Sequence, residues 1–253
     1  MMLLGNLIMN STNLGFVTDR DIRLFSFLHS VKAATSEQIN REIYSYKNVN
    51  VMGDRLRKME KTKLIIGCGV SHNGISRKYY CLASRGFNRF IHCDDIVREE
   101  LKTNSPSHDI DLVDIRRRLL DSKIASEYLC ENELQTWSEY LTDIHLAPYR
   151  LARCDGVAKM NFGGPVWIGI EYEATYKNRS RYKDILKRFY KNSGIPYVIY
   201  ICKNQELLGS IRSQDKKHYG EYKPKIMYIT LNDLMNSDVV CFTSREGKRI
   251  SLS

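Results

Sequence analysis

Two short runs of polar residues, separated by a glycine-rich turn, contain side chains that can bind a divalent cation. The first run includes Asp155, and the second includes Glu171, Glu173 and Lys177. In a β-strand alternate side chains share a face, so Glu171, Glu173 and Lys177 project to one side if the strand extends that far. A polar strand facing solvent would alternate in the same way, so the second run alone is weak support for a site.

The preceding run strengthens the pattern. If the hairpin turn is centred on Gly163, antiparallel pairing places residue 155 opposite residue 171, with Cβ atoms about 5 Å apart. Carboxylates this close raise one another's pKa unless a cation lies between them. Mg²⁺ or Mn²⁺ would take such oxygen ligands, and a nearby lysine can stabilise developing charge. This combination is what metal-assisted phosphodiester cleavage requires. The alternative is a set of surface salt bridges with basic residues such as Arg153.

A basic segment follows these acids. From Lys177 to Lys191, with both ends included, there are seven basic residues and one acid, Asp184. We expect a helix from about Arg179 to Asn192 whose charged face contacts phosphates beside the metal site. Lys183 and Lys187 could supplement or replace Lys177 in that site. The DNA-contacting residues predicted on this helix are Arg179, Arg181, Lys183 and Lys187.

Composition favours a polyanionic partner in a reducing compartment. The 253 residues carry a formal net charge of +10, and RNA, ribosomes or membranes would suit that charge as well as DNA does. The seven cysteines include no C-x-x-C pair, so we expect free thiols and a cytoplasmic protein. The set Cys68, His72, Cys81, His92 and Cys93 matches no familiar zinc spacing, and small buried residues are the simpler interpretation.

The N-terminal part has the pattern of a winged helix-turn-helix. Thr18 and the run Thr35–Gln38 are capping signals for two helices, a third helix is expected from about Asn48 to Lys61, and Asn73-Gly74 predicts a hairpin. In the third helix we expect Val51, Leu56 and Met59 to face inward. The predicted DNA contacts are Arg55, Arg57, Lys58 and Lys61 on the third helix, and Arg77 and Lys78 on the wing. The alternative is a charged helical domain that binds protein.

The rest of the chain predicts a second domain. The polar stretch Glu99–His108 separates residues 1–98 from residues 108–253. After it we expect a mixed α/β (α+β) sheet domain with helices on its faces, and a loosely ordered tail at Ser244–Ser253. The expected elements are helices at 110–128, 179–192, 205–213 and from 232, a shorter element at 131–140, and strands at 151–160, 166–175, 197–202 and 225–229. Met1–Met9 is too short to span a membrane, and no later segment qualifies.

Taken together, Arg153-Cys154-Asp155-Gly156 and Glu171-x-Glu173-x-Thr175-x-Lys177 resemble a variant PD-(D/E)xK nuclease motif. With His108-Asp109-Ile110, Asn132-Glu133-Leu134 and the winged helix, most of the chain is similar to MobC-type plasmid relaxases and related replication-relaxation proteins. The resemblance implies a restriction-endonuclease-like fold, nicking of double-stranded DNA at a plasmid transfer origin, and other mobilisation proteins as partners. It also implies Asp155, Glu171, Glu173 and Lys177 as the active-site set, with Glu133 as an additional acid.

The chain departs from the motif in two ways. Cys154 replaces the proline, which carries no chemistry, and the lysine lies four rather than two residues after the last acid. Two other functions share these features: a DNA-binding replication or mobilisation regulator with a silent nuclease fold, and a double-strand restriction or repair nuclease. The sequence leaves open whether water or a tyrosine attacks the DNA.

Overall fold

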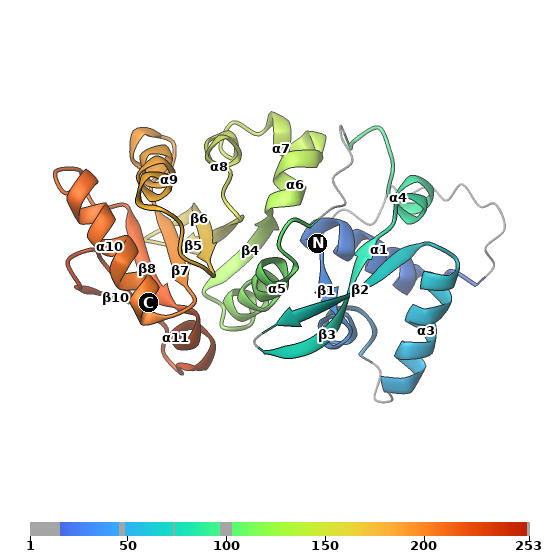
Figure 1. Cartoon of the computed structure of the whole chain (residues 1–253). Helices are drawn as coiled ribbons and strands as arrows, with labels where there is room; N and C mark the ends of the chain where they lie inside the picture. Colours follow the sequence, from blue (N-terminus) through green and yellow to red (C-terminus); the bar gives the residue numbers. More distant parts are fainter. Residues whose placement is uncertain (1–15, 46–48, 73, 97–102, 252–253) are drawn as a thin grey trace. The chain divides into compact units, whose positions relative to one another are not determined.

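The computed structural model describes residues 16–45, 49–72, 74–96 and 103–251. Four features expected from the sequence lie or begin outside the described residues. They are the apolar run Met1–Met9, the start of the third helix at Asn48, the turn residue Asn73, and the start of the polar stretch at Glu99. The chain forms two compact units, which we call unit 1 (Met1–Val113 and Thr136–Ser138) and unit 2 (Asp114–Gln135 and Glu139–Ser253). The protein is of the mixed α/β class, and each unit has its own sheet (Figure 1). In the described ranges no helix has the length and apolarity needed to cross a membrane.

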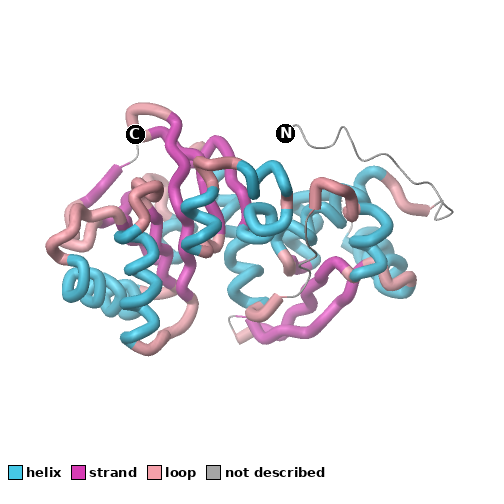
Figure 2. The backbone as a smooth tube through the Cα atoms, turned by 90° about the horizontal axis from the view of Figure 1, so that it is seen from above, coloured by secondary structure: helices cyan, strands magenta, loops and turns pink. Residues whose placement is uncertain are grey.

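Unit 1 consists of short helical segments followed by a β-hairpin. Its elements are α1 (Asp19–Val31), β1 (Ala34–Thr35), α2 (Ser36–Ile39), the π-helical turn η1 (Asn40–Tyr44), α3 (Val49–Lys61), β2 (Ile65–His72), β3 (Ile75–Leu82) and α4 (Ser84–Phe90). The hairpin β2–β3 is the long magenta pair in Figure 2, and β1 adds to it to give the order β1-β3-β2. The capping signal at Thr35 is confirmed, since its hydroxyl accepts the Gln38 N–H and its own N–H bonds the Gln38 side chain.

The inward face of α3 differs from the expectation at one residue. Met52, Leu56 and Met59 are buried, at helical spacing, whereas Val51 is 48 % exposed. The expectation of Val51 as an inward residue was therefore wrong, because Met52 rather than Val51 shares a face with Leu56 and Met59. Val51 lies on the solvent face of α3.

Unit 2 is built on a seven-stranded mixed sheet in the order β10-β9-β8-β7-β6-β5-β4. Strands β6, β7 and β8 are parallel, and the other neighbours are antiparallel. Helix α5 (Pro106–Asp121) ends in this unit. The further elements are β4 (Ala125–Cys130), α6 (Glu131–Thr136), α7 (Ser138–Thr142), α8 (Ala147–Ala152), β5 (Gly156–Asn161), β6 (Pro165–Glu173), α9 (Arg179–Lys191), β7 (Val198–Cys202), α10 (Gln205–Tyr219), β8 (Ile226–Thr230), α11 (Leu231–Asn236), β9 (Cys241–Thr243) and β10 (Arg249–Ser251).

Several expected boundaries in unit 2 were wrong. The helix expected to run to Tyr128 ends at Asp121, and the edge strand β4 follows it. The strand expected from Leu151 begins only at Gly156, because α8 occupies the residues before it and Arg153 ends that helix with φ 56°. Pro148 in the first turn of α8 suits a helix start. The central position expected for the 197–202 strand is confirmed, since β7 is the middle strand of the sheet.

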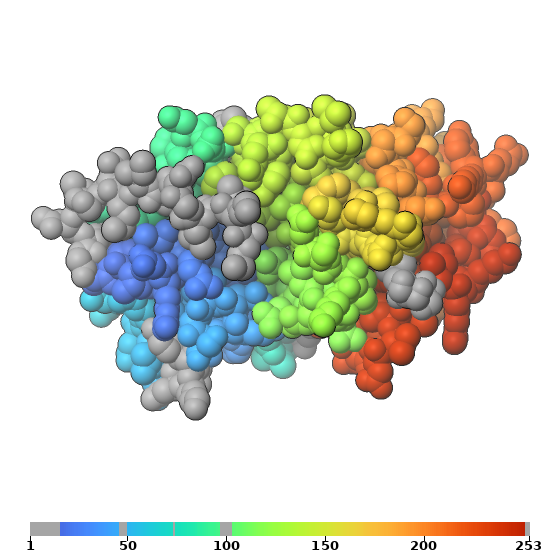
Figure 3. Space-filling model, turned by 180° about the vertical axis from the view of Figure 1, so that it is seen from behind, coloured from blue at the N-terminus to red at the C-terminus, as the bar shows by residue number. Residues whose placement is uncertain are grey.

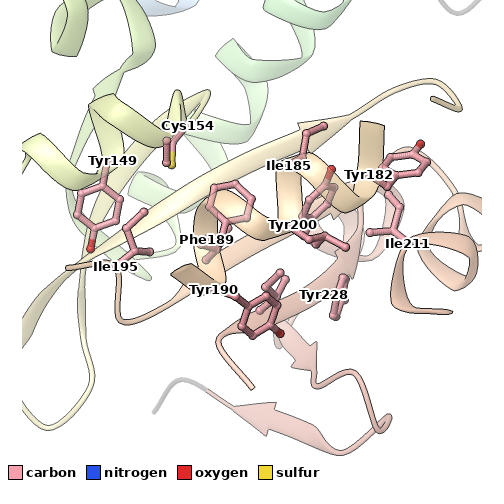
Figure 4. Packing of buried hydrophobic residues seen from close by; sticks show 14 of the residues in the cluster. Tyr149, Cys154, Tyr182, Ile185, Phe189, Tyr190, Ile195, Tyr200, Ile211 and Tyr228 are labelled. Carbon is pink, nitrogen blue, oxygen red and sulfur yellow. The ribbon is translucent and has the colours of Figure 1, made fainter. Parts of the chain in front are cut away.

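The main core of unit 2 lies between the sheet and the helices α8, α9 and α10. Alternate residues of β7, Val198, Tyr200 and Cys202, face this core and contact the buried stripe of α9. In Figure 4, Tyr149 and Ile195 lie at one end of the cluster, and Tyr182 lies at the other end near Tyr200 and Ile211. The same face of the sheet carries the residues considered below.

The described part of the C-terminal segment, where the sequence predicted a loose tail, is attached to the core through one buried arginine. Arg245, which follows β9, is 7 % exposed and donates to the carbonyls of Tyr219, Gly220 and Tyr222 at the end of α10. Its guanidinium also lies 3.8 Å from the carboxylate of Asp215, which is fully buried. Arg245 therefore ties the β9–β10 hairpin to the core.

Candidate active site

The β5–β6 hairpin has the register predicted from its turn. Gly163 has φ 73°, a backbone conformation that glycine adopts without strain, and the ladder pairs Asn161 with Pro165 and Gly156 with Ile170. The same register places Asp155 opposite Glu171, one step beyond the last pair. The turn that joins β5 to β6 reaches the surface, where it is yellow in Figure 3.

Asp155 is held against β6 by its side chain and against α6 by its backbone. Its carboxylate accepts the N–H of Tyr172 at 2.7 Å, and its carbonyl accepts the N–H of Glu131 at 3.0 Å. A Cβ at Gly156 would lie 2.4 Å from the Tyr128 hydroxyl, so the close approach of Tyr128 requires a glycine beside Asp155. Asp155 therefore leans toward the strand that carries both glutamates.

Glu171 and Glu173 project from β6 onto the face that carries the main core. Glu171 pairs with Tyr200 and Glu173 with Cys202 in the parallel ladder to β7. Their exposed fractions are 8 % and 2 %, which is unusual for carboxylates. A buried carboxylate is expected where a cation or a hydrogen-bond donor compensates its charge. This burial does not fit the alternative in which the two glutamates form salt bridges on the solvent-exposed surface.

Lys177 supplies part of the compensation. Its Nζ lies 2.6 Å from Oε2 of Glu173, four residues earlier, and its side chain is 22 % exposed. Strand β6 ends at Glu173, so the lysine does not continue the alternation that the sequence suggested. Lys183 and Lys187 lie on the exposed face of α9. Of the three lysines considered from the sequence, Lys177 is the one paired with a site acid.

The acids influence one another and their neighbours electrostatically. Burial raises the pKa of Glu173 above its usual value, and Lys177 lowers it without cancelling the effect, while the Asp155 charge adds to the increase. Burial, followed by the charges of Glu171 and Asp155, raises the pKa of the Cys154 thiol. Burial and then Glu171 and Glu173 raise the pKa of Tyr200. The Asp155 charge thus acts on Glu173, and between them the three acids act on the shared neighbours Cys154 and Tyr200.

A hard divalent cation would suit this donor set. The ligands are carboxylate oxygens, and a cation near Glu173 would offset the burial that raises its pKa. In the described ranges, no three His, Cys, Asp or Glu side chains are gathered around a single point as metal ligands, and this includes the zinc combination considered from the sequence. Binding an ion would therefore require Asp155, Glu171 or Glu173 to turn toward it.

Glu133 has a capping contact. It is the third residue of α6, and its carboxylate accepts the N–H of Cys130, just before the helix, at 2.7 Å. An acid at this position stabilises the start of a helix. This capping contact explains why an acid lies at position 133 without any role in catalysis. We therefore do not include Glu133 in the active-site set.

The exposed face of α9 is basic, as expected. Tyr182, Ile185, Leu186, Phe189 and Tyr190 form the buried stripe. The predicted DNA contacts on this helix, Arg179, Arg181, Lys183 and Lys187, are all exposed. Helix α9 begins two residues after Lys177 in the chain.

In unit 1 most of the predicted DNA-contacting residues are exposed. These are Arg57, Lys58 and Lys61 on α3 and Arg77 and Lys78 on β3. Arg57 forms an ion pair with Asp54, and Lys78 pairs with Glu60 at 2.7 Å. Such surface pairs are weak and can exchange for phosphate contacts.

Arg55 has a different environment. It donates to both carboxylate oxygens of Asp21, which is fully buried, and to the carbonyl of Phe16. The Tyr44 hydroxyl donates to the same carboxylate at 2.7 Å. Because the guanidinium is used inside unit 1, we leave Arg55 out of the proposed DNA contacts.

Two buried tyrosines beside the acids were not assigned a role from the sequence. Tyr200 lies opposite Glu171 on β7, and its hydroxyl has no hydrogen-bond partner in the part of the chain that the structure describes. The Tyr182 hydroxyl accepts the backbone N–H of Lys177. With sixteen tyrosines in the chain, only the fold distinguishes these two from the rest.

Comparison with known proteins adds no identification: no family model, curated protein or solved structure matches the chain.

Proposed function

We propose that the protein is a metal-dependent DNA endonuclease that nicks one strand at a plasmid transfer origin, as in MobC-type relaxases. Unit 2 would be a restriction-endonuclease-like domain with Asp155, Glu171, Glu173 and Lys177 as its active site. Unit 1 would be a winged helix that reads the duplex. A plasmid substrate places the protein in the cytoplasm, together with other mobilisation proteins.

The observation that carries this proposal is the burial of Glu171 and Glu173 on the strand against which Asp155 is held, at the end of the β5–β6 hairpin. Asp155 bonds the backbone between the two glutamates, and Glu173 pairs with Lys177 at 2.6 Å. Buried carboxylates beside an ammonium and a basic helix suit an anionic substrate that arrives with a cation. The two glutamates occupy alternate positions of one strand on the face that carries the main core, where a buried carboxylate is costly unless a cation compensates its charge.

The roles of the side chains follow from their chemistry. Mg²⁺ or Mn²⁺, when bound, would polarise the scissile phosphate and lower the pKa of a bound water. Asp155, Glu171 and Glu173 would hold the ion through oxygen atoms. Lys177 would stabilise the negative charge that develops on the phosphate, and α9 would contact the flanking backbone.

Incubation with supercoiled plasmid tests the proposal. We expect open-circular product with Mg²⁺ or Mn²⁺, none with EDTA, and faster nicking of a plasmid that carries a mobilisation origin. Linear product would instead favour a double-strand nuclease. Binding without cleavage under every metal would favour a silent regulator and contradict the proposal. Denaturing electrophoresis would distinguish a free 5′ or 3′ end from DNA joined covalently to a tyrosine.

The solvent face of α3 gives a separate prediction for unit 1. Gly53 lies inside this helix, and a Cβ there would meet no atom within 4 Å. No neighbouring atom in the protein therefore requires a glycine at this position of the helix. A glycine would be required if DNA bases approach the helix backbone closely, as they do when a helix lies in the major groove. We expect Gly53→Ala to raise the free energy of unfolding by about 0.5–1 kcal/mol and to weaken binding to duplex DNA roughly 10-fold.

Urea denaturation and fluorescence anisotropy with a short random-sequence duplex would measure the two effects. Gly209→Ala is the matched control, because Gly209 lies inside α10 with equally open space around it. That variant should gain stability and keep its DNA affinity. Equal DNA affinity in Gly53→Ala and the wild type would exclude a close approach at α3.

A further inference from the structure

The segment between β6 and α9 must fold back to bring Lys177 to the acids. Strand β6 ends at Glu173, and α9 begins at Arg179. If the chain continued as a strand, Lys177 would lie roughly 13 Å beyond Glu173 along the strand direction. Its Nζ instead lies 2.6 Å from the Glu173 carboxylate. Some contact must hold this short segment in its folded-back position.

Tyr182 makes that contact. Its hydroxyl accepts the backbone N–H of Lys177 at 2.9 Å and lies 3.4 Å from the carbonyl of Thr175, to which it can donate. A phenol can act in both ways at once. One side chain thus holds two backbone groups of the segment that carries the lysine.

Tyr182 is itself fixed firmly. Its exposed fraction is 1 %, and its ring lies at the end of the main core, near Tyr200 and Ile211 (Figure 4). It belongs to the first turns of α9, whose start is capped by the Asn178 side chain accepting the N–H of Arg181 at 2.9 Å. The hydroxyl is therefore placed by the core and not by the loop that it holds.

We propose that Tyr182 is a positioning residue that orients Lys177 toward Glu173. This explains how a lysine four residues after the acid can serve a site in which two residues is the usual separation. When the lysine lies two residues after the acid, the extended strand itself places both side chains on one face. For Lys177, which lies beyond the end of the strand, the Tyr182 hydroxyl takes over this placement. The effect on cleavage rests on the proposed nuclease function, whereas the effect on the Glu173–Lys177 pair does not.

The test uses the full chain and the variant Tyr182→Phe, which keeps the buried ring and removes only the hydroxyl. The exchange rate of the Lys177 backbone amide, followed by NMR, reports the hydrogen bond that the Tyr182 hydroxyl accepts. A crystal structure of the variant reports the separation between Lys177 Nζ and the Glu173 carboxylate, which is 2.6 Å in the wild type. Loss of alignment should speed the amide exchange and move Nζ beyond ion-pair distance, which is about 4 Å.

Tyr190→Phe is the matched control. Tyr190 is a buried tyrosine of the same helix, but its hydroxyl bonds Asp215 at 3.1 Å, away from Lys177. In this control the Lys177 amide should exchange at the wild-type rate, and Lys177 Nζ should stay beside Glu173. A Lys177 Nζ that remains within ion-pair distance of Glu173 in Tyr182→Phe would overturn the inference, whatever the nuclease activity.

Cleavage provides the second readout. We expect kcat for nicking to fall about 10- to 100-fold in Tyr182→Phe with little change in KM, because the lysine is misplaced while the DNA-contacting surfaces remain. A displaced Lys177 in Tyr182→Phe combined with an inactive wild type would support the positioning role and contradict the nuclease proposal. The two claims can thus fail separately.

Discussion

Glu173→Gln is expected to reduce metal-dependent nicking by about 100-fold or more. Glutamine keeps the size of the side chain but removes the charge that would bind the cation and pair with Lys177. Asp155→Asn should have an effect of similar size, because Asp155 leans on the strand between the two glutamates. The measurement is the rate of conversion of supercoiled plasmid to open circle at a fixed Mn²⁺ concentration.

The same substitution should not destabilise the protein. Burial raises the pKa of Glu173, so the folded state binds its proton more tightly than the unfolded state does. The stability that this group contributes is present at low pH and is lost as the pH rises through the folded-state pKa. At neutral pH the glutamine variant should therefore unfold at the same urea concentration as the wild type or at a higher one.

Glu127→Gln is the matched control for the loss of a carboxylate. Glu127 lies on β4 of the same sheet, is exposed, and pairs with Lys159 at 2.8 Å. This variant should retain wild-type nicking. If Glu173→Gln remains as active as Glu127→Gln, the active-site assignment is wrong, even if the protein proves to be a nuclease.

Arg55→Ala is expected to destabilise unit 1 by about 3–5 kcal/mol, because it leaves the buried Asp21 carboxylate without its cation. Burial opposes ionisation of Asp21, yet the contacts with Arg55, Thr18 and Tyr44 lower its pKa overall. The stability from this group is present above its unfolded-state pKa and is lost as the pH falls through the lower folded-state pKa. Urea denaturation at neutral pH would measure the loss.

Arg57→Ala, two residues away, separates stability from DNA binding. The Arg57 side chain is 65 % exposed, and its partner Asp54 is also exposed. Its removal should change the free energy of unfolding by less than about 0.5 kcal/mol while weakening binding to duplex DNA. Equal loss of stability in the two variants would contradict the distinction drawn between Arg55 and Arg57.

The register that places Asp155 opposite Glu171 was predictable because it depends on local geometry. A single glycine-centred turn determines the register of a hairpin, and the observed pairing of Gly156 with Ile170 follows from it. The basic helix after the acids was predictable for the same reason, since its charged and apolar residues alternate at helical spacing.

Features that depend on distant parts of the chain were not predictable. Arg55 resembles its basic neighbours in sequence, and only the position of Asp21, on another helix, makes it a buried partner. The helix predicted at 110–128 includes the residues that form the start of β4. These residues form a strand because they pair with β5, and their own composition does not indicate it. Tyr182 could not be distinguished from the other tyrosines until the path of the segment before α9 was known.

The buried Arg245 bears on how unit 2 can be divided for expression. A fragment that stops at Asn236 would retain every strand from β4 to β8 and all of the proposed active-site residues. It would lack the guanidinium that binds the last carbonyls of α10, and Asp215 would be left inside the protein without that cation. Fragments of unit 2 should therefore keep the chain through Ser251, and a cut in this hairpin should loosen a helix that is adjacent to the core.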